Sequence, residues 1–180
     1  EIDARRIGLI GHSVGAGAVL LVASRRPEVA AVVSVAAFSN PAAMMRRWLS
    51  QKRIPERPLG RYILGYVQDT IGQRFDDIAP VATIARVTCP VLLVHGADDE
   101  VVPLGEAQQI FAARSHEAVE LVVLSGDHDS FADLERHLGR LMDFLRRAMA
   151  QPLPPSRAWR PGAGDRSPHA PAPSDVRAAP

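Results

Sequence analysis

Four short apolar runs, separated by helix-like stretches, limit what this chain can fold into. The runs are rich in β-branched residues and lie at 7–10, 31–35, 91–94 and 121–124. Because they are almost continuously apolar, each is expected to be buried on both faces, as strands of a parallel sheet are when helices cover it. The sequence therefore predicts an α/β fold with a parallel sheet flanked by helices.

Helices are predicted after three of these runs, at 14–24, 104–114 and 131–149. Ser130 is a candidate N-cap of the last helix, with Asp133 three residues on. Apolar residues of this helix recur at three- and four-residue steps: Phe131, Leu134, Leu138, Leu141, Leu145 and Met149. This stripe is expected to lie on the sheet.

Two segments break the alternation of strands and helices. Residues 41–80 contain two helical pieces around a proline-bearing stretch, and we expect them to form a small helical cap inserted into a hydrolase domain at 1–150. Between 46 and 61 this segment has six basic residues and one acid, Glu56, which favours a solvated face, with an anionic substrate as the alternative. Residues 151–180 hold eight of the 15 prolines and are predicted to be a disordered tail.

The overall composition excludes several classes of function. The 21 basic and 20 acidic residues nearly cancel, and the arginine pairs are scattered, so we expect no nucleic-acid partner. No apolar run approaches the roughly 18 residues of a membrane span, so no membrane partner is expected either. The single cysteine, Cys89, rules out an internal disulfide, is expected to be a buried core thiol and favours a cytoplasmic location.

The segment Gly11-His12-Ser13-Val14-Gly15 follows the first predicted strand and opens the first predicted helix. In that position G-x-S-x-G is typical of a nucleophile elbow, in which glycines permit a tight turn that displays the serine hydroxyl. The amide of Val14, at the start of the helix, is the expected donor to an oxyanion. The alternative is that Ser13 is an ordinary helix N-cap.

A serine nucleophile needs a base, and the base needs an orienting acid. Candidate acids Asp98 and Asp99 follow the strand-like run at 91–94, and a simpler interpretation makes both of them loop-forming residues. His128, flanked by two aspartates, follows the last run and is the candidate base. His95 competes with it but precedes the acids, whereas the expected chain order is nucleophile, acid, histidine.

Three other histidines are expected to lie on the surface, away from the chemistry. His116 and His137 fall on predicted helices, and His169 falls in the predicted tail.

Three segments together resemble the α/β-hydrolase superfamily, and within it the dienelactone-hydrolase-like and serine-aminopeptidase-like esterases and peptidases of bacteria. They are IGLIGHSVGAGA, CPVLLVHGADDEVVP and GDHDSF. In these hydrolases the acid is the aspartate three residues before the Val-Pro step, which implies Asp99 with Asp98 as a turn residue. The resemblance implies that Ser13 attacks an acyl carbonyl of a small ester or amide, that His128 transfers the proton, and that Asp99 orients His128. No metal or organic cofactor is expected.

The resemblance covers only part of that fold. In the superfamily the nucleophile strand is the fifth of eight, and an earlier loop supplies a second oxyanion amide. Here the first apolar run begins at Ile7, so the sequence is expected to be the C-terminal portion of a longer hydrolase, with a sticky strand edge at 7–10. Without the second donor the isolated chain is expected to be nearly inactive, even with the three residues present.

Three other functions are compatible with the sequence. One is a hydrolase-like binding module without turnover, and another is an acyltransferase with the same three residues. The third is a metal site made of His95, Asp98, Asp127 and His128, which lacks a tight ligand spacing.

Overall fold

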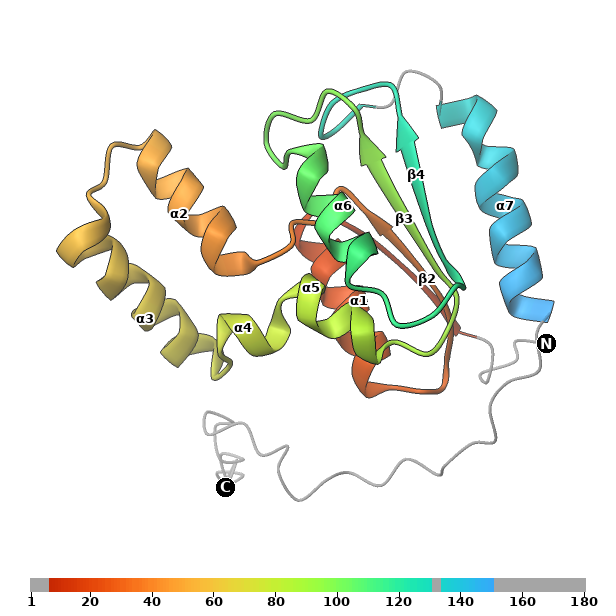
Figure 1. The fold of residues 1–180 in the computed structure, drawn as a ribbon, viewed down its shortest axis with the longest axis horizontal. Helices are drawn as coiled ribbons and strands as arrows, with labels where there is room; N and C mark the ends of the chain where they lie inside the picture. The colour runs from red at the N-terminus through yellow and green to blue at the C-terminus, as the bar shows by residue number, and fades with distance from the viewer. Residues whose placement is uncertain (1–6, 131–133, 151–180) are drawn as a thin grey trace, which may run out of the picture.

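The computed structural model describes residues 7–130 and 134–150, and the predicted tail lies outside these residues. Its centre is a four-stranded parallel sheet in the order β1-β2-β3-β4 (Figure 1). The strands are β1 (Ile7–His12), β2 (Val29–Val35), β3 (Val91–Gly96) and β4 (Val119–Leu124). The predicted α/β class is confirmed. Each strand extends beyond the apolar run from which it was predicted.

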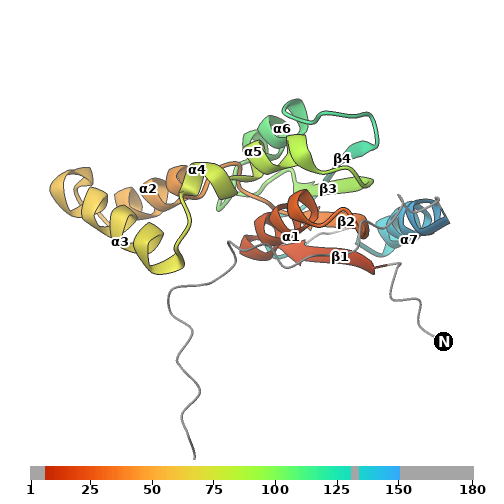
Figure 2. The same ribbon diagram turned by 90° about the horizontal axis from the view of Figure 1, so that it is seen from below.

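Helices cover both faces of the sheet. Helices α1 (Val14–Arg25) and α6 (Leu104–Ala112) pack on one face, and α7 (Leu134–Ala150) packs on the other (Figure 2). Neighbouring residues of one strand alternate between the two cores: Val32 joins the core under α1 and α6, whereas Val33 joins the core under α7. This two-sided burial explains the continuous apolar runs of the inner strands.

The inner face of α7 differs in detail from the predicted stripe. Among the α7 residues whose side chains the structure describes, Phe144 and Ala148 are buried, and Leu141, Leu145 and Met149 pack around them. Leu138 faces the sheet, as expected, but it is 44% exposed. The sheet does not continue past β1 in the described chain. Phe131 and Asp133 lie outside the described residues.

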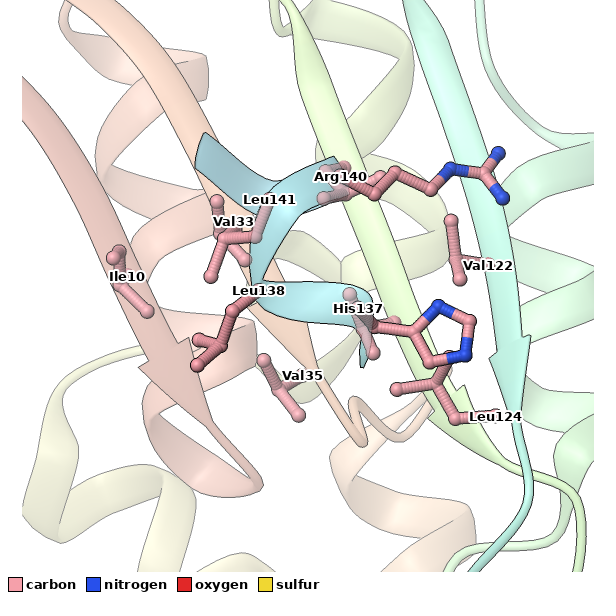
Figure 3. Close-up of a pocket in the computed structure, with 11 residues that line it drawn as sticks. Ile10, Val33, Val35, Val122, Leu124, His137, Leu138, Arg140 and Leu141 are labelled. Atoms are coloured by element: carbon pink, nitrogen blue, oxygen red, sulfur yellow. The ribbon is translucent and has the colours of Figure 1, made fainter. Parts of the chain in front are cut away.

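A cavity of about 90 Å³ lies where α7 crosses the sheet. Figure 3 shows Leu138 and Leu141 of α7 facing Val33 and Val35 of β2, with Ile10 of β1 at the side. The lining is apolar except for His137 and Arg140, and it contains no residue of the candidate site.

Among the described residues, strand β1 forms an edge of the sheet, and Ile7 and Ile10 are 47% and 60% exposed. Apolar side chains on an edge strand leave a surface that favours pairing with further chain. The sticky edge predicted at 7–10 is therefore present.

Residues 41–86 between β2 and β3 form short helices. They are α2 (Pro41–Gln51), a π-helical turn (Glu56–Gly60), α3 (Arg61–Ile71), α4 (Phe75–Ile78), α5 (Pro80–Thr83) and a 3-10 turn (Ile84–Arg86). Both views show α2 and α3 side by side, extending away from the sheet (Figures 1 and 2). Asn40 starts α2 by accepting a hydrogen bond from the amide of Ala42 at 2.8 Å, followed by Pro41 in the first turn.

No helix among the described residues has the length and apolar character needed to cross a membrane.

Candidate active site

Ser13 occupies a sharp turn between β1 and α1. Its backbone has φ 53° and ψ −114°, a combination that L-residues rarely adopt, and its amide donates a hydrogen bond to the carbonyl of Val35 at 2.9 Å. Although Ser13 precedes the helix, its side chain makes no capping hydrogen bond. The N-cap alternative therefore does not describe this serine, whose hydroxyl is directed elsewhere.

The two glycines of the pentapeptide have different roles. A Cβ atom on Gly11 would lie 2.2 Å from the carbonyl oxygen of Gly15, so only glycine fits at position 11. A Cβ atom on Gly15 would meet nothing within 4 Å. The expectation that both glycines permit a close backbone approach is correct for Gly11 and wrong for Gly15, because the turn brings the Gly15 carbonyl over Gly11 and leaves the Cα atom of Gly15 facing open space.

Asp99 is buried at the end of β3, and both of its carboxylate oxygens are used. One oxygen, Oδ1, accepts hydrogen bonds from the amides of Val101 at 2.9 Å and Val102 at 2.7 Å. The other, Oδ2, lies 2.8 Å from Nδ1 of His128. Asp98 is exposed in the turn, where its amide donates to the carbonyl of Gly126 at 3.0 Å.

His128 connects this carboxylate to the serine. Its Nδ1 faces Asp99, and its Nε2 lies 3.0 Å from Oγ of Ser13, which is 115 residues away in the sequence. An ionised carboxylate only accepts hydrogen bonds, so Nδ1 carries the proton and Nε2 is left to accept the hydroxyl proton of Ser13. The heavy-atom distances are within the range required for proton transfer.

The loop that carries His128 is held by Asp127. The carboxylate of Asp127 accepts hydrogen bonds from the Ser130 hydroxyl at 2.8 Å, the Ser130 amide at 2.8 Å and the Asp129 amide at 3.0 Å. These bonds, first that of the Ser130 hydroxyl, lower the pKa of Asp127 below its ordinary value. The Ser130 hydroxyl, predicted to cap α7, thus closes the turn at Asp127.

Gly96 lets this loop approach β3 closely. A Cβ atom on Gly96 would lie 2.5 Å from the carbonyl oxygen of Asp127 and 2.6 Å from that of Gly126. Gly126 has φ 137°, a conformation that side chains disfavour. Glycines at these two positions therefore permit the loop path that brings His128 to Ser13.

His95, the competing base candidate, is fully buried beside Asp99. Its Nε2 lies 2.7 Å from the carbonyl of Val102, to which it donates, and 3.5 Å from Oδ2 of Asp99. Its Nδ1 has no hydrogen-bond partner among the described residues. Its contacts are with Asp99 and with Val102 in the segment after it, so His95 supports the acid side of the cluster.

The role of His12 was missed by the sequence analysis. Its Nε2 donates a hydrogen bond to the backbone carbonyl of His128 at 2.8 Å, and the centroids of the two imidazole rings are 5.0 Å apart. His12 occupies the variable position of the pentapeptide, so the motif gives no signal for this contact.

The remaining histidines lie elsewhere. His137 is on α7, as predicted, and His169 is outside the described residues. The prediction of a helix at His116 is wrong, because α6 ends at Ala112 and His116 lies in the turn before β4. There His116 Nε2 donates to the carbonyl of Val87 at 3.0 Å, which explains why a loop residue is partly buried.

The predicted set of metal ligands does not assemble in the part of the chain that the structure describes. His95 donates its Nε2 to the carbonyl of Val102, and the carboxylate of Asp127 bonds its own loop. The side chains that do lie within ligating distance of one another are His12, His128 and Asp129.

A second buried carboxylate, that of Glu106 on α6, joins α2 to the core. It accepts hydrogen bonds from the Ser39 amide at 2.7 Å and the Ser39 hydroxyl at 2.6 Å, and it pairs with Arg47 of α2. Arg47 also donates to the carbonyl of Val101, at 3.3 Å, in the loop that holds Asp99. Burial alone would raise the pKa of Glu106, but the Ser39 hydrogen bonds and the Arg47 charge outweigh it and lower that pKa.

The buried thiol predicted at Cys89 is present, with 9% of the residue exposed. Burial raises the pKa of Cys89 to about 11, so the thiol is protonated at neutral pH.

Comparison with known proteins agrees with this architecture. The Mycobacterium tuberculosis protein Rv2307c is 28% identical over 154 residues, which is 84% of this chain and 47% of that protein. Cutinase 2 of Thermobifida cellulosilytica is 34% identical over 86 residues, which is 48% of this chain and 26% of the cutinase. The chain thus spans about half the length of the first of these relatives.

Among solved structures, the esterase domain of a Rhodothermus marinus protein superposes with a TM-score of 0.57 at 28% identity, covering 78% of this chain and 59% of that one. The family model for the prolyl oligopeptidase family matches residues 1–149. The parallel sheet, the elbow and these likenesses agree on the α/β-hydrolase superfamily, and the chain belongs to the prolyl oligopeptidase family.

Proposed function

We propose that the protein is a serine hydrolase in which Ser13 is the nucleophile, His128 the general base and Asp99 the orienting acid. The observation that carries the proposal is the pair of contacts of His128, 3.0 Å to the Ser13 hydroxyl and 2.8 Å to the Asp99 carboxylate. The backbone strain at Ser13 and the unused capping capacity of its hydroxyl support it, because strained residues are frequent at reacting positions.

In the first half of the reaction Oγ of Ser13 forms a bond to the acyl carbon while its proton passes to Nε2 of His128. The tetrahedral intermediate then loses its alcohol or amine, which takes that proton as its bond to the acyl carbon breaks. In the second half a water molecule attacks the acyl-enzyme, and His128 again takes a proton and returns it to Ser13. Asp99 stabilises the imidazolium that forms between the steps. These steps use no metal or organic cofactor.

The amide of Val14 is the proposed donor to the oxyanion. It belongs to the first residue of α1, where amide groups have no partner inside the helix. The positive end of the helix dipole points in the same direction and favours the developing negative charge. We propose that the second donor of this oxyanion hole comes from chain upstream of β1.

For the substrate we propose a small ester or amide. Support comes from the cutinases and esterases among the relatives and from the family, whose members are named for peptide cleavage. We further propose that residues 1–150 form the hydrolase domain, with 41–80 as its cap. The salt bridge between Arg47 and Glu106 connects this cap to the core next to the loop of Asp99.

A fluorophosphonate probe, which labels activated serines, tests the proposal directly. We expect it to label the chain, produced together with any natural upstream segment, at Ser13, and we expect Ser13→Ala and His128→Ala to abolish the labelling. Ser50→Ala is the matched control, because Ser50 is exposed on α2. Labelling that survives Ser13→Ala would contradict the assignment of the nucleophile. Wild-type protein that is neither labelled nor active on short-chain esters would favour a binding module.

A further inference from the structure

Two imidazoles and one carboxylate lie close together beside Ser13. No step of the proposed hydrolysis requires all three of them. The ligand atoms of His12, His128 and Asp129 all lie within 4.8 Å of one another. Two nitrogen ligands and one oxygen ligand, with a fourth position open, are the donors that Zn²⁺ accepts in many protein sites. We propose that Zn²⁺ binds reversibly to these three side chains and thereby switches off the serine.

The orientation of His128 suits a metal ligand as well as a base. Its Nδ1–H donates to Oδ2 of Asp99 at 2.8 Å, which fixes the tautomer and leaves the lone pair of Nε2 exposed toward Ser13. Histidines that bind zinc usually donate their other ring N–H to a carboxylate in this way. Asp99 would therefore hold the zinc-bound ring as it holds the free one.

The other two ligands are able to adjust. Tetrahedral ligands at the usual bond lengths of zinc are about 3.3–3.5 Å apart, so the three atoms must move closer together. His12 and Asp129 are both exposed, and the carboxylate of Asp129 makes no hydrogen bond among the described residues. Nε2 of His12 donates to the carbonyl of His128, so His12 would bind zinc through Nδ1 or give up that bond. The adjustment therefore falls on two exposed side chains while the buried Asp99 stays in place.

Binding would remove the base from the reaction. The lone pair of Nε2 that accepts the Ser13 proton is the one that zinc would occupy, so the 3.0 Å contact must break. Zinc and the activated serine are then mutually exclusive. Mg²⁺, which prefers oxygen ligands and keeps its waters, is not expected to compete. The inhibition of the serine by zinc rests on the proposed hydrolase function, whereas the binding of zinc does not.

Binding is tested without turnover in the Ser13→Ala variant. Isothermal titration with Zn²⁺ and the visible absorption of Co²⁺, which is intense only in tetrahedral sites, report the affinity and the geometry. We expect one site per chain, with affinity lowered about tenfold or more by His12→Ala, Asp129→Asn or Asp99→Asn. His137→Ala and Asp98→Asn serve as matched controls, because both residues lie outside the cluster. Their affinity is expected to equal that of the parent.

Inhibition is then measured on protein with Ser13 intact, as the rate of fluorophosphonate labelling with and without Zn²⁺. The proposal is supported if Zn²⁺ slows the labelling, if a chelator restores the original rate, and if Zn²⁺ slows the His12→Ala variant less than the parent. Equal Zn²⁺ affinity in the His12→Ala, Asp129→Asn and His137→Ala variants would overturn it. So would an octahedral Co²⁺ spectrum. If zinc binds as expected but the serine is never labelled, the metal site stands and the proposed hydrolase function fails.

Discussion

His12 donates a hydrogen bond from its Nε2 to the backbone carbonyl of His128, at 2.8 Å, and so links the nucleophile turn to the histidine loop. The two residues are 116 positions apart in the sequence. His12 directly precedes Ser13, and the ring of His128 contacts the Ser13 hydroxyl. This bond acts on the backbone that carries the proposed base, so His12 is a positioning residue.

We expect His12→Ala to slow fluorophosphonate labelling by up to about tenfold, the value of one neutral hydrogen bond. His12→Gln, whose amide can reach the same carbonyl, should recover part of the rate. His137→Ala, a change of the same kind on α7, should leave the rate unchanged. A His12→Gln variant as slow as His12→Ala would show that ring packing, with centroids 5.0 Å apart, matters more than the hydrogen bond.

Gly96→Ala is expected to displace the histidine loop. The new methyl group would lie 2.5 Å from the Asp127 carbonyl oxygen, and this obstacle is backbone, which has no alternative rotamer. A displacement of about 1 Å at the base costs on the order of 10²-fold in rate. The measurement is the labelling rate together with thermal unfolding, which separates a moved loop from an unfolded chain.

Gly65→Ala is the control for this substitution, since a Cβ atom there meets nothing within 4 Å and the site lies inside α3. It should keep the labelling rate and raise the free energy of unfolding by about 0.5–1 kcal/mol. A fully active Gly96→Ala variant would mean that the loop tolerates a second path.

The fold and the cluster of three side chains were predictable from the sequence because local rules act there. Apolar runs signal buried strands, and the carboxyl ends of parallel strands meet at one edge of a sheet, so the residues after β1, β3 and β4 converge. This logic brings Ser13, His128 and the segment with Asp98 and Asp99 to one edge of the sheet, and the resemblance to the α/β-hydrolases then singles out Asp99. Their catalytic roles remain a prediction.

The supporting contacts were not predictable, because they depend on how loops cross in space. The bond from His12 to a backbone carbonyl, the pairing of Glu106 with Arg47 and the close approach at Gly96 join segments far apart in the sequence. A backbone carbonyl carries no sequence signal at all. The error at Gly15 has the same origin, since the motif marks two glycines but only the turn geometry shows which one is crowded.

Gly11→Ala and Gly15→Ala are therefore expected to differ sharply. The first places a methyl group 2.2 Å from a carbonyl oxygen within the elbow, so the turn at Ser13 must open and the labelling should be lost. The second adds a methyl group in open space at the start of α1, where alanine favours the helix. Circular dichroism and the labelling rate of both variants test this, and equal loss of activity would contradict it.

Glu106→Gln tests the connection between α2 and the core through its dependence on pH. In the folded protein the Ser39 hydrogen bonds and the Arg47 charge, acting against burial, lower the pKa of Glu106. A lowered pKa means that the ionised carboxylate stabilises the fold above the pKa of the unfolded chain, and that this contribution is lost as the pH falls through the lower, folded value. We expect Glu106→Gln to reduce the free energy of unfolding by about 1–3 kcal/mol at neutral pH.

The difference between the wild type and Glu106→Gln should shrink as the solution is acidified, because the wild-type carboxyl then becomes neutral as well. Urea unfolding at several pH values measures it, and Glu117→Gln is the control, because the side chain of Glu117 is 97% exposed. A pH-independent difference would show that Glu106 acts through packing and neutral hydrogen bonds. Because Arg47 also donates to the Val101 carbonyl, beside the amides that hold Asp99, we expect the labelling rate to fall with stability in Glu106→Gln but not in Glu117→Gln.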